Sequence, residues 1–317
     1  MSASAEVTAQ AKRKARSARS KSLRAFFRNP KAKIGFAIFA IFMLMAIFAP
    51  LIAPYSPTAT LFSPLSAPSW RHWLGTTGTG QDVLSQFIWG ARTSLTVGVG
   101  AGALSTLIAV LMGMLPAYKG GWVDRTFDTI TNIFLIIPGL PLIIVITSYI
   151  HNSGPYVIIL VIGLTGWAGG ARVFRSQALT YVARDFVVAA KLAGASDLWI
   201  LFKEILPNML SLIVSSLMFG TLGGILAEAG LEFLGLGNVS VVSWGTMLYW
   251  SDAGGALLMG AWWWLVPGGL GIALFGMSLA LMNFGIDQVT NPRLRDASPV
   301  RQKKKKKVAV KGEVVHG

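Results

Sequence analysis

The chain has 317 residues, of which 53% are hydrophobic and only 13% charged, and its mean hydropathy is +0.59. A soluble globular domain carries about 25% charged residues, so this composition points to lipid as the solvent for most of the chain. The absence of cysteine excludes disulfides and Cys-based metal sites.

The first element is a basic tail, residues 1–33, which holds ten of the 28 Lys and Arg. Within it, Ser22–Asn29 sets apolar side chains against Arg24 and Arg28, which predicts a short interfacial helix on the inner membrane surface. A second basic tail, 292–317, includes the run Lys303–Lys307. Basic tails beside membrane spans attract anionic lipid. We therefore expect membrane lipid, and no nucleic acid, as the partner of these charges.

Between the tails, residues 34–291 form one membrane domain. Its first apolar run has about 20 residues, which is too long for the core of a secretory signal but matches a hydrocarbon layer about 30 Å thick. We predict an all-α integral membrane protein with six transmembrane helices. They are expected at Ile34–Ala53, Ser94–Tyr118, Phe127–Ile150, Tyr156–Phe174, Met209–Leu234 and Met259–Asn283.

The distribution of charge predicts how this domain is oriented. With six spans both tails lie on one side, and 26 of the 28 Lys and Arg fall on that side. The other side has only Arg71 and Arg92. By the positive-inside rule, we expect a multi-pass protein with both termini in the cytoplasm.

Three long loops follow from these spans: a first outer loop at 54–93, an inner loop at 175–208 and a second outer loop at about Gly235–Leu258. In the inner loop, Val187–Leu192 predicts a short helix, and Gly194 allows a break with positive φ. Ser196 or Asp197 then caps a second helix, which we expect to be stopped by Pro207. Apolar side chains on this second helix suit the groove of a partner protein. The same residues also suit a loop that packs under its own bundle.

The inner loop contains Ala189-Ala190-x-x-x-Gly194 and then Leu206-Pro207. This pattern resembles the cytoplasmic coupling loop of bacterial ABC-transporter permeases. Other stretches resemble the dipeptide/oligopeptide permease family in the same order, and the long first outer loop is most similar to its C-type subunit. These stretches are Leu74-Gly75-Thr76-Thr77, Gly80-Gln81-Asp82-Val83-Leu84-Ser85, Gly90-Ala91-Arg92-Thr93-Ser94-Leu95, Tyr118-x-Gly120-Gly121-x-x-Asp124, Glu228-x-x-Leu231-x-Phe233-Leu234-Gly235-Leu236-Gly237, Ser243-Trp244-Gly245 and Asn291-Pro292-Arg293.

The resemblance implies the type I ABC importer permease fold in a bacterial or archaeal plasma membrane. It also implies a B-type permease as partner, so that the two subunits form the translocation pathway for peptides. Two ABC ATPase subunits would bind inside, and an extracytoplasmic solute-binding protein would deliver solute outside. The chain has no Gly-x-x-x-x-Gly-Lys-Ser/Thr phosphate loop. We therefore expect no enzyme activity and no cofactor on this chain, with ATP and Mg²⁺ bound by the ATPase partners.

The resemblance assigns coupling to the ATPase to one set of inner-loop residues: Val188, Ala189, Ala190, Gly194, Ala195, Ser196, Asp197, Leu198, Leu206 and Pro207. It assigns docking of the binding protein to Gly75, Asp82, Arg92 and Trp244. Val188 departs from the family, which usually has Glu there, so docking is expected to depend on apolar contact and Lys191. Gln81 also departs, because Gly-Arg-Asp is common at this point of the outer loop.

Glu228 and Glu232 lie one helical turn apart near the outer end of the fifth span. A carboxylate inside a membrane is costly and is a candidate for function, so both are candidates for the solute pathway. This close to the interface, they can equally be solvated or capped by the Gly-rich segment that follows. His72, His151 and His316 are far apart in the sequence, and we expect no metal site.

Three alternatives stay open on the sequence alone. The same kind of complex imports oligosaccharides or nickel chelates in some members of the resembling family. A secondary transporter or channel would work without an ATPase. A scaffold that binds partners through its basic tails would need Lys303–Lys307 more than its spans.

Overall fold

The computed structural model describes residues 26–27, 29–150 and 154–290, with side chains described to residue 286. Most of both basic tails, His151, His316 and Asn291-Pro292-Arg293 lie outside this part, as does all but a fragment of the expected interfacial helix. Within it, secondary structure is helical apart from one isolated β-bridge between Thr76 and Asp82.

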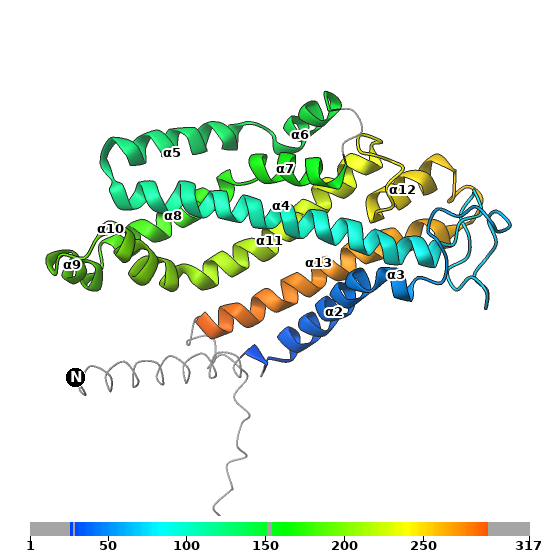
Figure 1. Ribbon diagram of the computed structural model, residues 1–317, viewed down its shortest axis with the longest axis horizontal. Helices are drawn as coiled ribbons and strands as arrows, with labels where there is room; N and C mark the ends of the chain where they lie inside the picture. The colour runs from blue at the N-terminus through cyan, green and yellow to red at the C-terminus, as the bar shows by residue number, and fades with distance from the viewer. Residues whose placement is uncertain (1–25, 28, 151–153, 291–317) are drawn as a thin grey trace, which may run out of the picture.

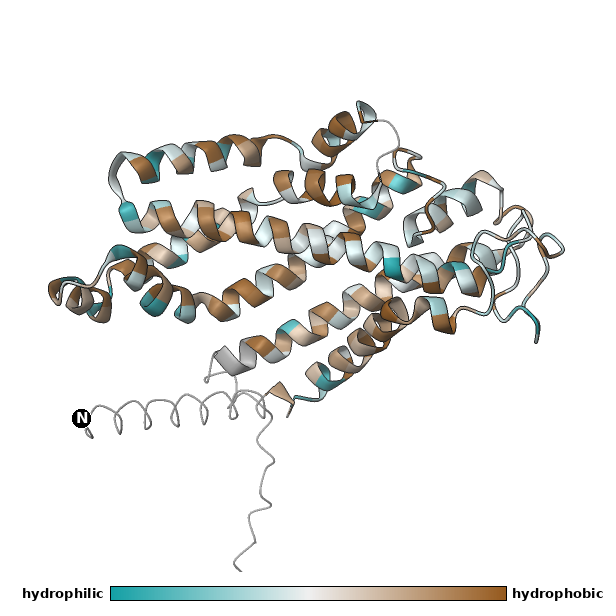
Figure 2. Ribbon diagram, in the orientation of Figure 1, coloured by the Kyte–Doolittle hydropathy of each residue, from teal (hydrophilic) through white to brown (hydrophobic). Residues whose placement is uncertain are grey.

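Four long helices form the frame of the bundle and run side by side (Figure 1). Each is long and apolar enough to cross a membrane, and brown, hydrophobic positions recur along these helices, with paler and hydrophilic positions in α4 (Figure 2). They are α2 (Pro30–Ile47), α4 (Val83–Lys119), α11 (Leu206–Phe233) and α13 (Trp262–Thr290).

Two further spans are bent helix pairs. Helices α5 (Gly121–Ile136) and α6 (Gly139–Ser148) meet at 81°, and α7 (Pro155–Thr165) and α8 (Ala168–Val182) meet at 45°. Pro138 explains the first break, because a proline disfavours helical geometry in the residue before it, and Ile137 is extended with ψ of 123°. The prediction of an all-α protein with six spans is confirmed, counting each bent pair as one span.

Several boundaries differ from the predicted ones. Helix α4 begins at Val83, before the predicted start of the second span at Ser94, because Asp82 caps the helix by accepting a hydrogen bond from Ser85 N at 2.8 Å. The end of the predicted loop 54–93 is therefore helical from Val83 onward. Two short helices, α3 (Ala49–Ile52) and α12 (Trp244–Ala253), lie towards the right-hand end of the bundle in Figure 1.

Helix α4 is the central element and packs against α7, α8 and α11. Its crossing with α11 is close because small residues face each other there. A Cβ added to Gly102 would lie 2.4 Å from Thr221 N, and one added to Gly98 would lie 2.2 Å from the Ile225 side chain. Small residues at such crossings let helices pack tightly in lipid, where the hydrophobic effect does not drive helix association.

Candidate functional site

The candidate coupling loop stands at one end of the bundle, at the left in Figure 1, between α8 and α11. It contains α9 (Asp185–Leu192) and α10 (Asp197–Trp199), separated by the expected break at Gly194. Gly194 has φ of +80°, and Ala195 N donates to Ala190 O at 3.1 Å across the break. This is the geometry of a glycine-terminated helix end, which a residue with a Cβ adopts only with strain.

The second half of the loop differs from prediction. Ser196 caps α10 by accepting from Trp199 N at 3.4 Å, but the helix does not stop at Pro207. It widens into the π-helical segment η1 (Ile200–Ile205) and continues directly into α11. Pro207 follows the π-helical turn directly, as the second residue of α11, and does not end the helix. The loop is therefore joined rigidly to the fifth span.

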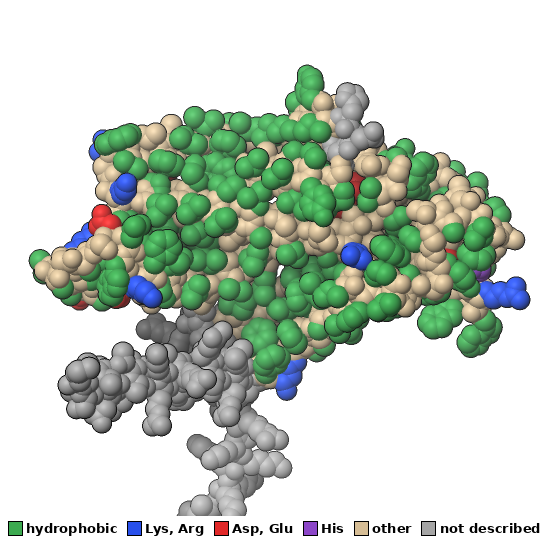
Figure 3. All heavy atoms as spheres, in the orientation of Figure 1, with side chains coloured by type: hydrophobic (Ala, Val, Ile, Leu, Met, Phe, Trp, Pro, Cys, Tyr) green, Lys and Arg blue, Asp and Glu red, His purple; other side chains and the backbone are tan. Residues whose placement is uncertain are grey.

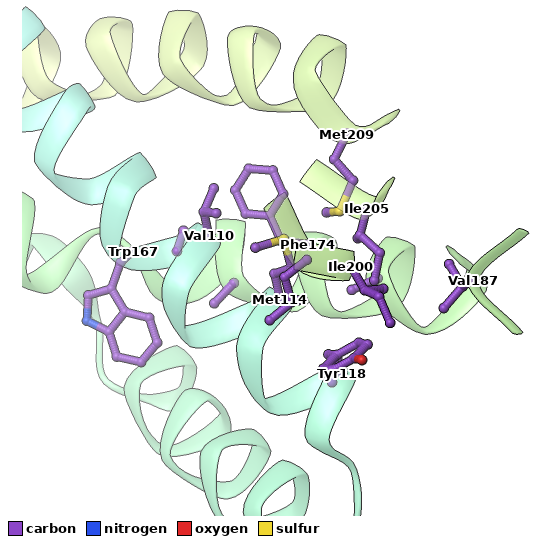
Figure 4. Packing of buried hydrophobic residues seen from close by; sticks show 14 of the residues in the cluster. Val110, Met114, Tyr118, Trp167, Phe174, Val187, Ile200, Ile205 and Met209 are labelled. Atoms are coloured by element: carbon purple, nitrogen blue, oxygen red, sulfur yellow. The ribbon is translucent and has the colours of Figure 1, made fainter. Parts of the chain in front are cut away.

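The inner face of the loop belongs to a hydrophobic cluster shared with the spans (Figure 4). Val187, Ile200 and Ile205 are fully buried. They pack with Met114 from α4 and Phe174 from α8, whose side chains point toward the same centre (Figure 4). The alternative of a loop that packs under its own bundle therefore holds for this face.

The opposite face of the loop is apolar and exposed. Leu192 is 86% exposed and Leu198 66% exposed, and Val188, Trp199 and Phe202 are about half exposed. Exposed apolar clusters of this kind mark protein–protein contacts. Of the other predicted coupling residues, Ala189, Gly194, Ser196, Asp197 and Pro207 are exposed and Ala190, Ala195 and Leu206 are half-buried.

A polar contact ties the loop to the end of α4. Tyr118 OH donates to Asp197 Oδ1 at 2.7 Å, and Lys191 Nζ lies 4.7 Å from the centroid of the Tyr118 ring. Asp185 occupies the first turn of α9, where a negative charge favours the helix dipole. Helix α9 therefore has an acidic residue three positions before Val188, the position where the family usually has Glu.

An ion pair links the two bent spans at the same end. Arg175 of α8 donates Nε to Asp124 Oδ1 at 2.7 Å and Nη2 to Asp124 Oδ2 at 2.8 Å. Asp128 lies 3.5 Å from the same guanidinium. The sequence pattern contained Asp124 but gave no indication of its partner. Acidic and basic side chains are seen together at this end in Figure 3, whereas hydrophobic side chains cover the middle of the bundle.

The two candidate pathway carboxyls are buried near the other end of α11. Glu228 accepts from Ser94 Oγ at 3.1 Å, and Glu232 accepts from Ser243 Oγ. Ser94 also accepts from Trp244 N at 3.1 Å, so the cluster fixes the start of α12 on α4 and α11. Both carboxyls face these hydroxyls, and neither is among the described residues that line the cavities beside Thr246, Ser105 and Trp70.

The predicted outer docking residues are mostly inside the fold. Asp82 is 1% exposed and accepts from Ser85 and pairs with His72 at 2.9 Å. Trp244 is fully buried, and a Cβ at Gly75 would lie 2.5 Å from the Trp263 ring. These three residues are buried within the subunit and pack against its own segments, and their docking role stays a prediction. Arg92 is exposed, with its guanidinium 5.6 Å from the Trp89 ring.

Comparison with known proteins identifies two matching family models. The model described as the inner membrane component of binding-protein-dependent transport systems matches residues 105–296. The model described as the N-terminal transmembrane domain of oligopeptide transport permease C matches residues 17–68. Together they cover the tail, the first span and most of the membrane domain.

Individual relatives match over most of their length. A putative peptide permease protein of Brucella suis is 34% identical over 86% of this chain and 90% of its own. The oligopeptide transport system permease protein OppC of Bacillus subtilis is 34% identical over 85% of this chain and 88% of its own. Among solved structures, the inward-facing MetNI methionine ABC transporter has a similar fold, with a TM-score of 0.52 and 19% identity over 65% of this chain and 94% of that one.

Proposed function

The chain belongs to the inner-membrane components of binding-protein-dependent ABC importers, as an oligopeptide permease of the C type, and on that premise we propose that its loop 175–208 couples ATP hydrolysis by partner subunits to import of short peptides. The observation that carries the proposal is the two-faced loop. One face is built into the core with α4, α8 and α11, and the other presents exposed apolar side chains around Leu192 and Leu198.

The geometry gives a mechanism for the coupling. A partner that moves the exposed face must also move α11, because η1 continues into that helix without a break. It must move α4 as well, through the packing of Ile200 and the hydrogen bond from Tyr118 to Asp197. Motion of the ATPases would thus reach two spans that line the centre of the bundle.

The remaining assignments follow from the same premise. The partners are a B-type permease, two ABC ATPases and an extracytoplasmic solute-binding protein. ATP and Mg²⁺ bind to the ATPases, and this chain has no ATPase site. The coupling loop and both termini lie in the cytoplasm, as the concentration of basic residues at that end supports. Several relatives are named for peptides, which favours peptides over oligosaccharides or nickel chelates.

Replacing Gly194 with Trp in the reconstituted complex tests the coupling function. The substitution strains the break and places a bulky group on the exposed face. We expect import to fall more than tenfold and ATP hydrolysis to lose its response to the binding protein, with the bundle still folded. Import at the wild-type rate would contradict the proposal, and import that persists without ATPase subunits would indicate a secondary transporter or channel.

Gly120 provides a matched control. It also has positive φ, +69°, and an added Cβ at either glycine would meet no heavy atom within 4 Å. Gly120 lies at the same end of the bundle but outside the loop, between α4 and α5. Gly120→Trp therefore also places a bulky residue at a backbone position with positive φ, but outside the loop, and we expect coupling to survive it.

A further inference from the structure

A cavity of about 540 Å³ lies between α4, α6, α11 and the junction of α7 and α8. Its volume is within the range of about 300–1,000 Å³ that is usual for small-molecule sites. Ser105 of α4 and Ser216 of α11 line it, and both lie well inside their helices, so the cavity is at mid-depth of the bundle. Phe219 and Leu226 line it as well and are more than half exposed, so it opens to the side of the subunit.

The lining offers hydroxyl groups but no charge. No ionisable side chain is among the described residues that line the cavity. Within the same part of the chain, the hydroxyls of Ser105 and Ser216 make no hydrogen bond to protein. Behind the wall, the buried Thr106 hydroxyl is also unpaired and would lie 3.5 Å from a Cβ at Gly220. Polar groups left unpaired inside a membrane are costly, so water or a solute is needed here.

Two glycines keep the cavity wide. A Cβ added to Gly139 or Gly223 would meet no heavy atom within 4 Å. Gly224 is different, because its Cβ would lie 3.1 Å from Gly98 O and the residue is needed for helix packing. Glycine inside a helix costs about 1 kcal/mol relative to alanine. Packing within this subunit does not require a glycine at position 223. A side chain at that position would instead fill part of the cavity.

We propose that this cavity is the subunit's half of the solute pathway and binds an uncharged, hydrogen-bonding part of the solute, such as the amide backbone of a short peptide. The proposal rests on the proposed function above. With no charged lining, this half cannot pair with the termini of a peptide. It selects by cross-section, and Gly139 and Gly223 set the width that it accepts.

Thiol labelling tests whether the cavity is a wet pathway. This chain has no cysteine, so Gly223→Cys gives this subunit its only thiol, and labelling of this subunit is compared with that in the wild-type complex. A cationic, membrane-impermeant methanethiosulfonate reacts with the thiolate, which forms in water and not in lipid. We expect Gly223→Cys to react at least tenfold faster than Gly269→Cys. Gly269 lies on α13, also has open space at its Cβ, and does not line the cavity.

Import of two tripeptides tests the width. Gly223→Phe should reduce uptake of triphenylalanine at least tenfold and uptake of trialanine less than threefold, whereas Gly269→Phe should change neither. Equal labelling of the two cysteine variants, or equal loss of both tripeptides, would overturn the cavity as the width-selective pathway. ATP hydrolysis stimulated by the binding protein is measured on the same samples. If the binding protein does not stimulate ATP hydrolysis by the wild-type complex, the proposed function itself is contradicted.

Discussion

Tyr118, the penultimate residue of α4, donates a hydrogen bond of 2.7 Å to Asp197, the first residue after the capped break in the coupling loop. These residues are 79 positions apart in the chain. Their contact joins the central span to the loop by a route that does not pass through α11. It predicts that coupling depends on a single hydroxyl group.

We expect Tyr118→Phe to keep the ring under Lys191 and to lose only this hydrogen bond, at a cost of about 1 kcal/mol in stability. Import per ATP hydrolysed should fall several-fold, because α4 then follows the loop only through the packing of Ile200. Asp197→Ala should have the same effect, and the double variant should be no worse than either single one. Tyr156→Phe, at an exposed tyrosine elsewhere, is the control. Additive losses in the double variant would show that the two residues act separately.

Docking should tolerate an acid at Val188 and not at Leu198. Both side chains are exposed, at 47% and 66%, and both lie on the apolar face of the loop. Val188→Glu restores the acid usual in the family, and Asp185 already satisfies the dipole of α9. Leu198→Glu places a charge on the part of the apolar face that we expect to contact the ATPase, and burying that charge in the contact costs desolvation free energy. We expect less than a twofold change in ATPase binding for Val188→Glu and more than tenfold weakening for Leu198→Glu.

Binding of the purified ATPase to the reconstituted permease measures both variants. Thermal unfolding of the permease alone is the control, and should be unchanged in each. If Leu198→Glu leaves binding of the ATPase unchanged, docking does not depend on the apolar face around Leu198.

The ion pair between Arg175 and Asp124 should stabilise the inner end of the bent spans. Asp124→Ala leaves the half-buried guanidinium with only Asp128 at 3.5 Å. We expect a loss of about 1–2 kcal/mol, because the bidentate pair is partly exposed. Exchanging the charges, Asp124→Arg with Arg175→Asp, should recover part of it. The free energy of unfolding of the permease is measured in detergent at several salt concentrations. If the charge-exchanged variant is no more stable than Asp124→Ala, the ion pair does not stabilise the fold.

The buried carboxyl of Glu232 should act through its hydrogen bond and not through its charge. It accepts from Ser243 Oγ, the hydroxyl that caps α12, and no Lys or Arg pairs with it in the described part of the chain. Glu232→Gln keeps a polar group of the same shape and puts no charge into the membrane. We expect its stability to be within about 1 kcal/mol of wild type, whereas Glu232→Ala should cost about 2–4 kcal/mol.

Thermal unfolding in detergent distinguishes these outcomes, with import measured in parallel. A Glu232→Gln variant that folds normally but does not import would mean that the carboxylate itself takes part in transport. In that case the pathway function first assigned to Glu232 would be correct.

Much of the fold follows from the sequence because lipid imposes simple rules. A run of about 20 apolar residues must satisfy its backbone as a helix, and the charged residues that flank such runs predict which end lies inside. The break at Gly194 and the cap at Ser196 are equally local, since each depends on a single residue and its neighbours. The prediction that the second loop helix stops at Pro207 was wrong, because the helix continues through the π-helical turn into α11.

Only the tertiary structure decided which residues meet. Asp82, Glu228 and Trp244 are motif residues in the sequence, but long-range packing buries all three and makes them supports for the outer loops. The partners Tyr118 with Asp197 and Asp124 with Arg175 are far apart in the chain. The sequence by itself determined a six-span permease and indicated a candidate coupling loop. The cavity beside Gly223 and the two faces of that loop exist only because distant helices pack together, and no local pattern encodes the space between them.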